Sequence, residues 1–168
     1  MISLSGEIRS VRENNPSWKS KSRIIGRAGE KFCSTKIKCF NCGESDWLEC
    51  SVNQKSKDQI CNQCNKQYQI KCKKVTEKSY KKIIDLKIFK TIGAEYKTTL
   101  KSLDQEIDYV IILYNSNCEI LDILHIRSDL ITSKNIIPRK PLSQTARRCG
   151  WQGCYLYFDD FRSTREQS

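Results

Sequence analysis

The sequence predicts a single α/β domain in which helices flank a mixed sheet and four cysteines bind a zinc ion. Apolar residues recur at every fourth position within 76–104, which is the spacing of a helix that buries one face. Two apolar runs, 108–114 and 118–126, are separated by an Asn-Ser-Asn turn and predict a hairpin of two buried strands. Two Cys-x2-Cys pairs supply the zinc ligands. At 168 residues the chain is long enough for one well-buried domain and short for two.

Residues 1–19 are predicted to form an N-terminal arm, and the domain is expected to span 20–161. The arm is polar and contains Asn14-Asn15-Pro16, which favours a loosely ordered segment or an edge strand followed by a turn. Residues 20–32 carry apolar side chains at helical spacing, although two glycines weaken the pattern. We therefore expect a helix at the start of the domain.

The zinc site is predicted within residues 37–72. Cys39 and Cys42 form one pair and Cys61 and Cys64 the other, with eighteen residues between the pairs. Each pair can form a knuckle that donates two thiolates from a tight turn, and the glycine after Cys42 permits the positive φ that such a turn requires. Buried free thiols are the alternative. The other six cysteines show no second paired spacing and are expected to be mostly small buried residues in a reducing compartment.

The remaining elements follow from local composition. Trp47, Leu48 and Val52 suggest a short strand between the knuckles, and Gly93 is expected to end the helix within 76–104. Residues 134–161 are rich in arginine, proline and glycine, so we expect a surface loop that leads to a final short strand. Residues 162–168 are expected to form a C-terminal tail.

The charge of the chain points to a polyanionic partner. Thirty Lys and Arg residues against nineteen Asp and Glu residues give a net charge of +11, spread over most of the chain. Nucleic acid is favoured over an anionic membrane surface, because no apolar run approaches the roughly twenty residues of a spanning helix. The first residues lack the blocks of a signal peptide, which indicates a cytoplasmic or organellar protein. The single histidine, His125, lies in an apolar stretch, which argues against histidine-based nucleophilic catalysis.

Asp58, Gln69 and Lys71 bracket the second cysteine pair. If that pair forms the turn of a hairpin, residue 58 faces roughly residue 67, and residues 69 and 71 share that face. The three side chains then converge, since diagonal cross-strand neighbours lie about 7 to 8 Å apart. A carboxylate and an amide oxygen can hold magnesium while a lysine orients water or stabilises charge on phosphorus, which suits phosphodiester hydrolysis. A solvated hairpin face would carry the same residue types.

The stretch from Asn135 to Leu142, followed by Thr145 to Cys154, closely resembles the catalytic domain of the DpnI-type family of restriction endonucleases. The shared elements are Arg-Lys-Pro-Leu, Thr-Ala-Arg-Arg and Gly-Trp-x-Gly-Cys in that order, and the similarity covers roughly residues 20–158. The resemblance implies a restriction-endonuclease-like fold of the PD-(D/E)xK type. It also implies magnesium-dependent cleavage of double-stranded DNA at GATC sites that carry N6-methyladenine.

The resemblance further implies catalytic positions. Asp58 and Lys71 fall on the family's aspartate and lysine, whereas Gln69 falls where the family has a glutamate, so one negative charge is lost and weaker metal binding is expected. Glu30 matches an acid on the family's first helix and could supply part of that charge. The enzyme of the resembled family continues into a winged-helix domain that also reads methylated DNA. The resemblance stops before that domain, so a weaker sequence preference is expected.

DNA contacts are expected from four basic residues, because arginine forks bind phosphate and guanine. These residues are Arg139, Lys140, Arg147 and Arg148. Structural ion pairing is the alternative for them. Trp151 could contact a methylated base or could belong to the core. Two other functions stay open: a methylated-DNA-binding module that lost turnover with Gln69, and a zinc-ribbon protein that binds RNA.

Overall fold

The computed structural model describes residues 2–50, 57–90, 96–145, 149, 152–158 and 162–163, and every structural statement below concerns these residues. The helices are α1 (Ser5–Asn14), α2 (Lys21–Lys36), α3 (Glu77–Leu86) and α4 (Tyr96–Asp104). The strands are β1 (Trp47–Glu49), β2 (Gln59–Cys61), β3 (Gln67–Lys74), β4 (Ile88–Lys90), β5 (Asp108–Tyr114), β6 (Ile120–Ile126), β7 (Ile136–Pro138), β8 (Cys154–Tyr157) and β9 (Arg162–Ser163). Two 3-10 turns, Ser128–Leu130 and Ser133–Asn135, follow β6.

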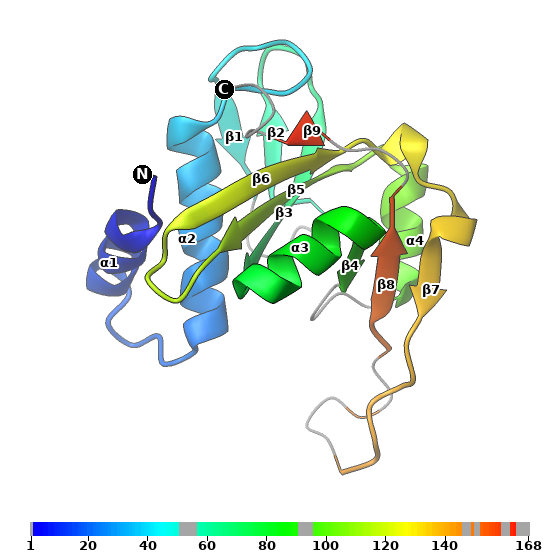
Figure 1. Cartoon of the computed structure of the whole chain (residues 1–168). Helices are drawn as coiled ribbons and strands as arrows, with labels where there is room; N and C mark the ends of the chain where they lie inside the picture. Colours follow the sequence, from blue (N-terminus) through cyan, green and yellow to red (C-terminus); the bar gives the residue numbers. More distant parts are fainter. Residues whose placement is uncertain are drawn as a thin grey trace.

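A six-stranded mixed sheet forms the centre of the protein, in the order β1-β2-β3-β5-β6-β9. Strands β3 and β5 run parallel, and the other neighbouring pairs run antiparallel. A smaller antiparallel sheet, β4-β8-β7, lies beside it (Figure 1). This arrangement confirms the predicted mixed sheet flanked by helices.

Two hydrophobic layers cover the faces of the large sheet. Helices α1 and α2 lie on one face, where Phe32 and Ala28 pack with Val110 and Ile112 of β5. Helix α3 and the small sheet lie on the other face, where the alternate β5 residues Ile111 and Leu113 are buried (Figure 1). Strand β5 is therefore buried on both faces, which explains why its sequence is an unbroken apolar run.

The hairpin predicted from the two apolar runs is confirmed. Strands β5 and β6 pair antiparallel, with Tyr109 opposite Ile126 and Ile112 opposite Ile123. The helix predicted over 20–32 is also confirmed and extends to Lys36. Its N-cap is Ser20, whose side-chain oxygen accepts a hydrogen bond from the backbone N–H of Arg23. Strand β1 lies within the segment expected to hold a strand between the knuckles.

The prediction of one helix within 76–104 is wrong in its middle. Helix α3 begins after a capping box at Thr76 and ends at Leu86, because Lys87 takes the left-handed conformation with φ 49°. The next residues leave the helix and form β4, in which Ile88 pairs with Tyr157 of β8. Tertiary pairing has overridden the helical spacing at Ile88. Gly93, the predicted helix breaker, lies outside the described residues.

The N-terminal segment is a helix rather than the expected arm or edge strand. Helix α1 buries Ile8 and Val11 in the same core layer as α2, and Leu4 just before it is fully buried. These three apolar residues have helical spacing, which the polar composition of the segment obscured. A single bridge between Ser3 and Glu119 is the strand-like contact of this region.

The C-terminal third forms more regular structure than the predicted loop with one final strand. Strands β7 and β8 pair antiparallel, with Ile136 opposite Leu156, and both of these side chains are buried. Within the described residues, no helix has the length and apolarity needed to cross a membrane.

Helix α2 approaches β3 closely at Gly29. A Cβ atom at this position would lie 2.1 Å from the Cys72 Sγ atom of β3, so only glycine permits the contact. The helix therefore continues through a residue that lowers helix propensity because packing against the sheet requires it. The next residue, Glu30, is thereby placed beside β3.

Candidate active site and metal centre

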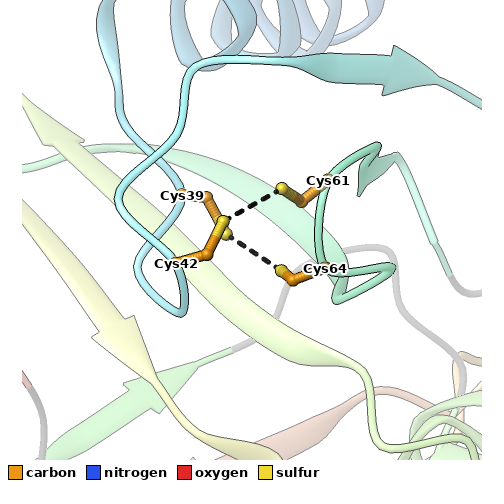
Figure 2. Close-up of side chains that lie close together, drawn as sticks. All are labelled: Cys39, Cys42, Cys61 and Cys64. Atoms are coloured by element: carbon orange, nitrogen blue, oxygen red, sulfur yellow. Dashed lines mark hydrogen bonds between the residues drawn. The ribbon is translucent and has the colours of Figure 1, made fainter.

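Cys39, Cys42, Cys61 and Cys64 form one compact cluster. Their Sγ atoms all lie within 4.8 Å of one another, and the cross-pair distances are 3.6 Å for Cys39 to Cys64 and 3.5 Å for Cys42 to Cys61 (Figure 2). A tetrahedral zinc ion with Zn–S bonds of about 2.3 Å would separate its sulfur ligands by about 3.8 Å. The four sulfurs fit this geometry, so the cluster can bind a zinc ion.

The two knuckles share one backbone arrangement. In the first, the N–H of Gly43 donates to the Cys39 carbonyl, and in the second the N–H of Asn65 donates to the Cys61 carbonyl. Both donor residues have positive φ, 81° for Gly43 and 58° for Asn65. The positive φ expected at the glycine is confirmed, and asparagine, which tolerates this region better than most residues, takes the same place in the second knuckle.

The surroundings of the cluster favour the ionised form of one ligand. Burial opposes ionisation of Cys64, but hydrogen bonds from the Asn41 side chain and from the Lys66 backbone outweigh it and lower the pKa of the thiol to about 6. Cys64 is then a thiolate at neutral pH, which is the form that binds metal. The sequence cue for this effect is the asparagine that directly precedes Cys42.

Tyr68 connects the cysteine cluster to strand β3. Its hydroxyl lies 3.2 Å from Cys39 Sγ, and its fully buried ring contacts Trp47 at a centroid distance of 5.2 Å. Burial and the neighbouring Cys39 sulfur raise the pKa of Tyr68, so the hydroxyl keeps its proton and is able to donate a hydrogen bond to the Cys39 sulfur. Gln69 directly follows Tyr68 on β3. The contact between Tyr68 and Cys39 therefore links the metal centre to the strand that carries the candidate catalytic residues.

We expect Tyr68→Phe to weaken zinc binding about tenfold, because it removes a hydrogen bond to a ligand sulfur while keeping the ring. Competition for zinc with a chromophoric chelator measures the change. Tyr155→Phe, which also deletes one hydroxyl but lies on β8 away from the cluster, is the matched control. Equal zinc affinities for the parent and Tyr68→Phe would contradict this role.

Asp58 directly precedes β2, next to the strand that carries Gln69 and Lys71. The register pairs Gln59 with Tyr68, and its continuation places Asp58 opposite Gln69 rather than opposite residue 67 as the hairpin geometry suggested. One carboxylate oxygen of Asp58 accepts a hydrogen bond of 2.7 Å from the backbone N–H of Ile70. This hydrogen bond fixes Asp58 beside β3, just before β2 begins. Beyond this point the described part of β2 no longer pairs with β3.

Glu30, Asp58 and Lys71 line one cleft of about 510 Å³ between α2 and the edge of β3. Burial raises the pKa of the Glu30 carboxyl and the negative charge of Asp58 raises it further, while the hydrogen bond from Arg27 opposes both. A carboxylate whose ionised form is disfavoured in this way is stabilised by a divalent cation beside it. Glu30 and Asp58 line the same cleft, and carboxylate oxygens are ligands whose chemistry fits a magnesium ion.

Gln69, unlike the other predicted catalytic residues, does not line the cleft. The side chain is buried, with a relative exposure of 9%, and the residues that line the cleft do not include it in the described part of the chain. Alternation along β3 places Gln69 and Lys71 on the face away from α2. Lys71 reaches the cleft from farther along the edge of the strand.

The predicted DNA-contacting residues are only partly described. Arg139 is half-buried, and its guanidinium lies 5.8 Å from the ring centroid of Tyr155, while Lys140 is exposed. Arg147, Arg148 and Trp151 lie outside the described residues.

Two residues near the cleft were missed by sequence reasoning. The Gln59 side chain donates a 2.5 Å hydrogen bond to the backbone carbonyl of Glu30 and so ties β2 to α2. Arg27 forms ion pairs with both Glu30 and Glu49. Arg27 and Glu30 are three residues apart on α2, so helical spacing could have revealed the first pair. The Glu49 contact depends on tertiary packing.

His125 is a sheet residue, as predicted. It is 3% exposed on β6, and its Nε2 atom lies 2.8 Å from a carboxylate oxygen of Asp108. The other carboxylate oxygen pairs with Lys66 at 2.8 Å and accepts from the Ser128 backbone. Burial opposes ionisation of Asp108, but these donors outweigh it and hold the pKa of the carboxyl below its usual value.

One comparison with known proteins covers nearly the whole chain. The model of a family described as DpnI, Dam-replacing family, matches residues 9–164. The match includes the four cysteines, Glu30, Asp58, Gln69 and Lys71.

Proposed function

Because the chain belongs to the DpnI, Dam-replacing family, we propose that it is a magnesium-dependent endonuclease that cleaves double-stranded DNA at GATC sites bearing N6-methyladenine. The observation that carries the proposal is the cleft that Glu30, Asp58 and Lys71 line together at the edge of β3. Two acids that can hold a metal ion and one lysine that can stabilise negative charge are groups suited to hydrolysis of a phosphodiester.

The proposed site is of the PD-(D/E)xK type. Asp58 precedes β2, Lys71 lies on the adjacent strand β3, and Glu30 reaches the same cleft from α2. We assign the two carboxylates as the groups that would hold the metal, which would supply Lewis acidity and lower the pKa of a bound water. The ammonium group of Lys71 orients that water or stabilises the charge that develops on the phosphate oxygens.

Gln69 supports a second candidate function, a methylated-DNA-binding module without turnover. Glutamine in place of glutamate removes one negative charge opposite Asp58, and its side chain is buried. In the first candidate function Glu30 supplies the second carboxylate, so the lost charge does not remove activity. In the second, Glu30 is too strongly paired with Arg27, at 2.9 Å, to replace the missing ligand.

Purified zinc-loaded protein, incubated with adenine-methylated and unmethylated plasmid in magnesium, tests these candidates. We expect cleavage of the methylated plasmid alone. In Gln69→Glu, one negative charge added opposite Asp58 is expected to lower the magnesium concentration for half-maximal cleavage about tenfold. Gln69→Asn, which stays neutral and shortens the side chain, controls for substitution at this position. A parent that retains methylated DNA without cutting it, and is made active by Gln69→Glu, would establish the binding module instead.

A further inference from the structure

A second hollow continues the candidate active site along α2. It measures about 480 Å³ and is lined by Trp18, Arg23, Arg27 and Lys57, among others. Glu30 and Asp58 line both this hollow and the cleft that contains Lys71, and so do Ser22 and Gly26. The two spaces therefore form one groove, here named the α2 groove, with the acidic pair at its midpoint.

Positive charges lie on both sides of the acidic pair in the α2 groove, which suits a polyanion. One arm carries Arg23 and Lys57, and the other carries Lys71, Lys73 and Lys74. A sugar-phosphate backbone that lies along this groove would meet cations on both sides of the acidic pair. The phosphate over Glu30 and Asp58 would then be the one that reacts.

In the arm of the groove away from Lys71, Arg23 is a cation whose position is held by an aromatic side chain. Its guanidinium carbon lies 3.8 Å from the ring centroid of Trp18, so the planar group is stacked on the indole. The Arg23 residue is exposed and Trp18 is half-buried. Stacking restrains the guanidinium at low conformational cost and occupies its face rather than its N–H groups, which are the groups that bind a phosphate in bidentate fashion.

We propose that the α2 groove holds the sugar-phosphate backbone of the DNA strand to be cut, with Arg23, supported by Trp18, binding a phosphate beyond the acidic pair. This inference rests on the proposed nuclease function and specifies how its substrate lies. It places DNA along α2, in addition to the contacts expected from the 139–151 segment. Trp18 acts through Arg23 as a positioning residue.

Binding is measured apart from cleavage, by titrating a methylated DNA duplex in magnesium-free buffer at several salt concentrations. Arg23→Ala is expected to weaken binding about tenfold and to reduce the salt slope by about one, the value for one lost phosphate contact. Trp18→Ala is expected to weaken binding in the same direction, whereas Trp18→Phe, which keeps an aromatic face, retains most of the affinity. Lys82→Ala on α3 is the control, because it removes one exposed positive charge outside the groove.

The outcomes separate this inference from the nuclease proposal. If the parent does not cut DNA but Arg23→Ala lowers the DNA affinity and the salt slope, the groove assignment is supported and the nuclease proposal is rejected. If the parent cuts DNA but Arg23→Ala has the parental affinity and salt slope, the nuclease proposal is supported and the groove assignment is rejected. Tighter Arg23-dependent binding of an RNA duplex than of methylated DNA would overturn the assignment to DNA. Folding of each variant is checked by zinc content and circular dichroism.

Discussion

Cleavage of methylated DNA is expected to fall about 1,000-fold in Lys71→Ala and in Asp58→Asn, because each removes a charged group from the reacting phosphate or its metal. Asn is the sharper substitution at residue 58. It retains an oxygen that can accept the 2.7 Å hydrogen bond from the Ile70 N–H, so the end of β2 stays fixed while the negative charge is lost. Single-turnover rates at saturating magnesium measure the effect on chemistry.

Two exposed residues of α3 provide the matched controls for this pair. Asp85→Asn and Lys82→Ala make the same changes in charge on a surface that does not line the cleft. Both controls should cut at the parental rate. The assignment of Asp58 and Lys71 fails if either active-site variant also cuts at that rate while its zinc content and unfolding temperature match the parent. DNA affinity in magnesium-free buffer should change by far less than the cleavage rate.

Local sequence was sufficient to predict those parts of the fold in which one pattern dominates. The apolar runs and the two Cys-x2-Cys pairs are local signals: the runs formed the predicted strands β5 and β6, and the four cysteines lie together in one cluster that can bind a metal. Ile88 shows the limit of this approach. It continues a helical spacing, yet it pairs with Tyr157, nearly seventy positions later, and that partner cannot be read from the residues around position 88. Helix α1 was missed because its segment contains few apolar residues. Few are enough when a neighbouring helix covers them.

The candidate site was predictable in its residue types and not in its geometry. Asp58, Lys71 and Glu30 came from spacing and resemblance, and all three line the same cleft. Their convergence depends on Gly29, which lets α2 approach β3, and on Gln59, which ties β2 to the Glu30 carbonyl. Neither role has a local sequence signature. The expected register of β2 against β3 was also off by two residues, because the turn between these strands includes the residues after Cys64 that return the chain into β3.

Loss of one zinc ligand is expected to have the largest effect on stability. Cys61 is fully buried at the end of β2, and its partner sulfurs come from both knuckles. We expect Cys61→Ser to lower the free energy of unfolding by about 5 kcal/mol or more, because the binding free energy of a structural zinc contributes directly to folding and typically exceeds that amount. Chemical denaturation monitored by circular dichroism, with zinc content measured in parallel, gives the value.

Cys149→Ser is the control for this change, because Cys149 is exposed and is not part of the cluster. It should keep the parental zinc content and unfolding curve. The two variants also separate a metal centre from buried thiols. If the four sulfurs only packed against one another, chelation would leave the parent folded and Cys61→Ser would cost no more than an ordinary core substitution. With zinc as the link between the knuckles, a chelator should instead unfold the parent at the β1-β2-β3 edge of the sheet, where Tyr68 meets Cys39, and cleavage should be lost together with the metal.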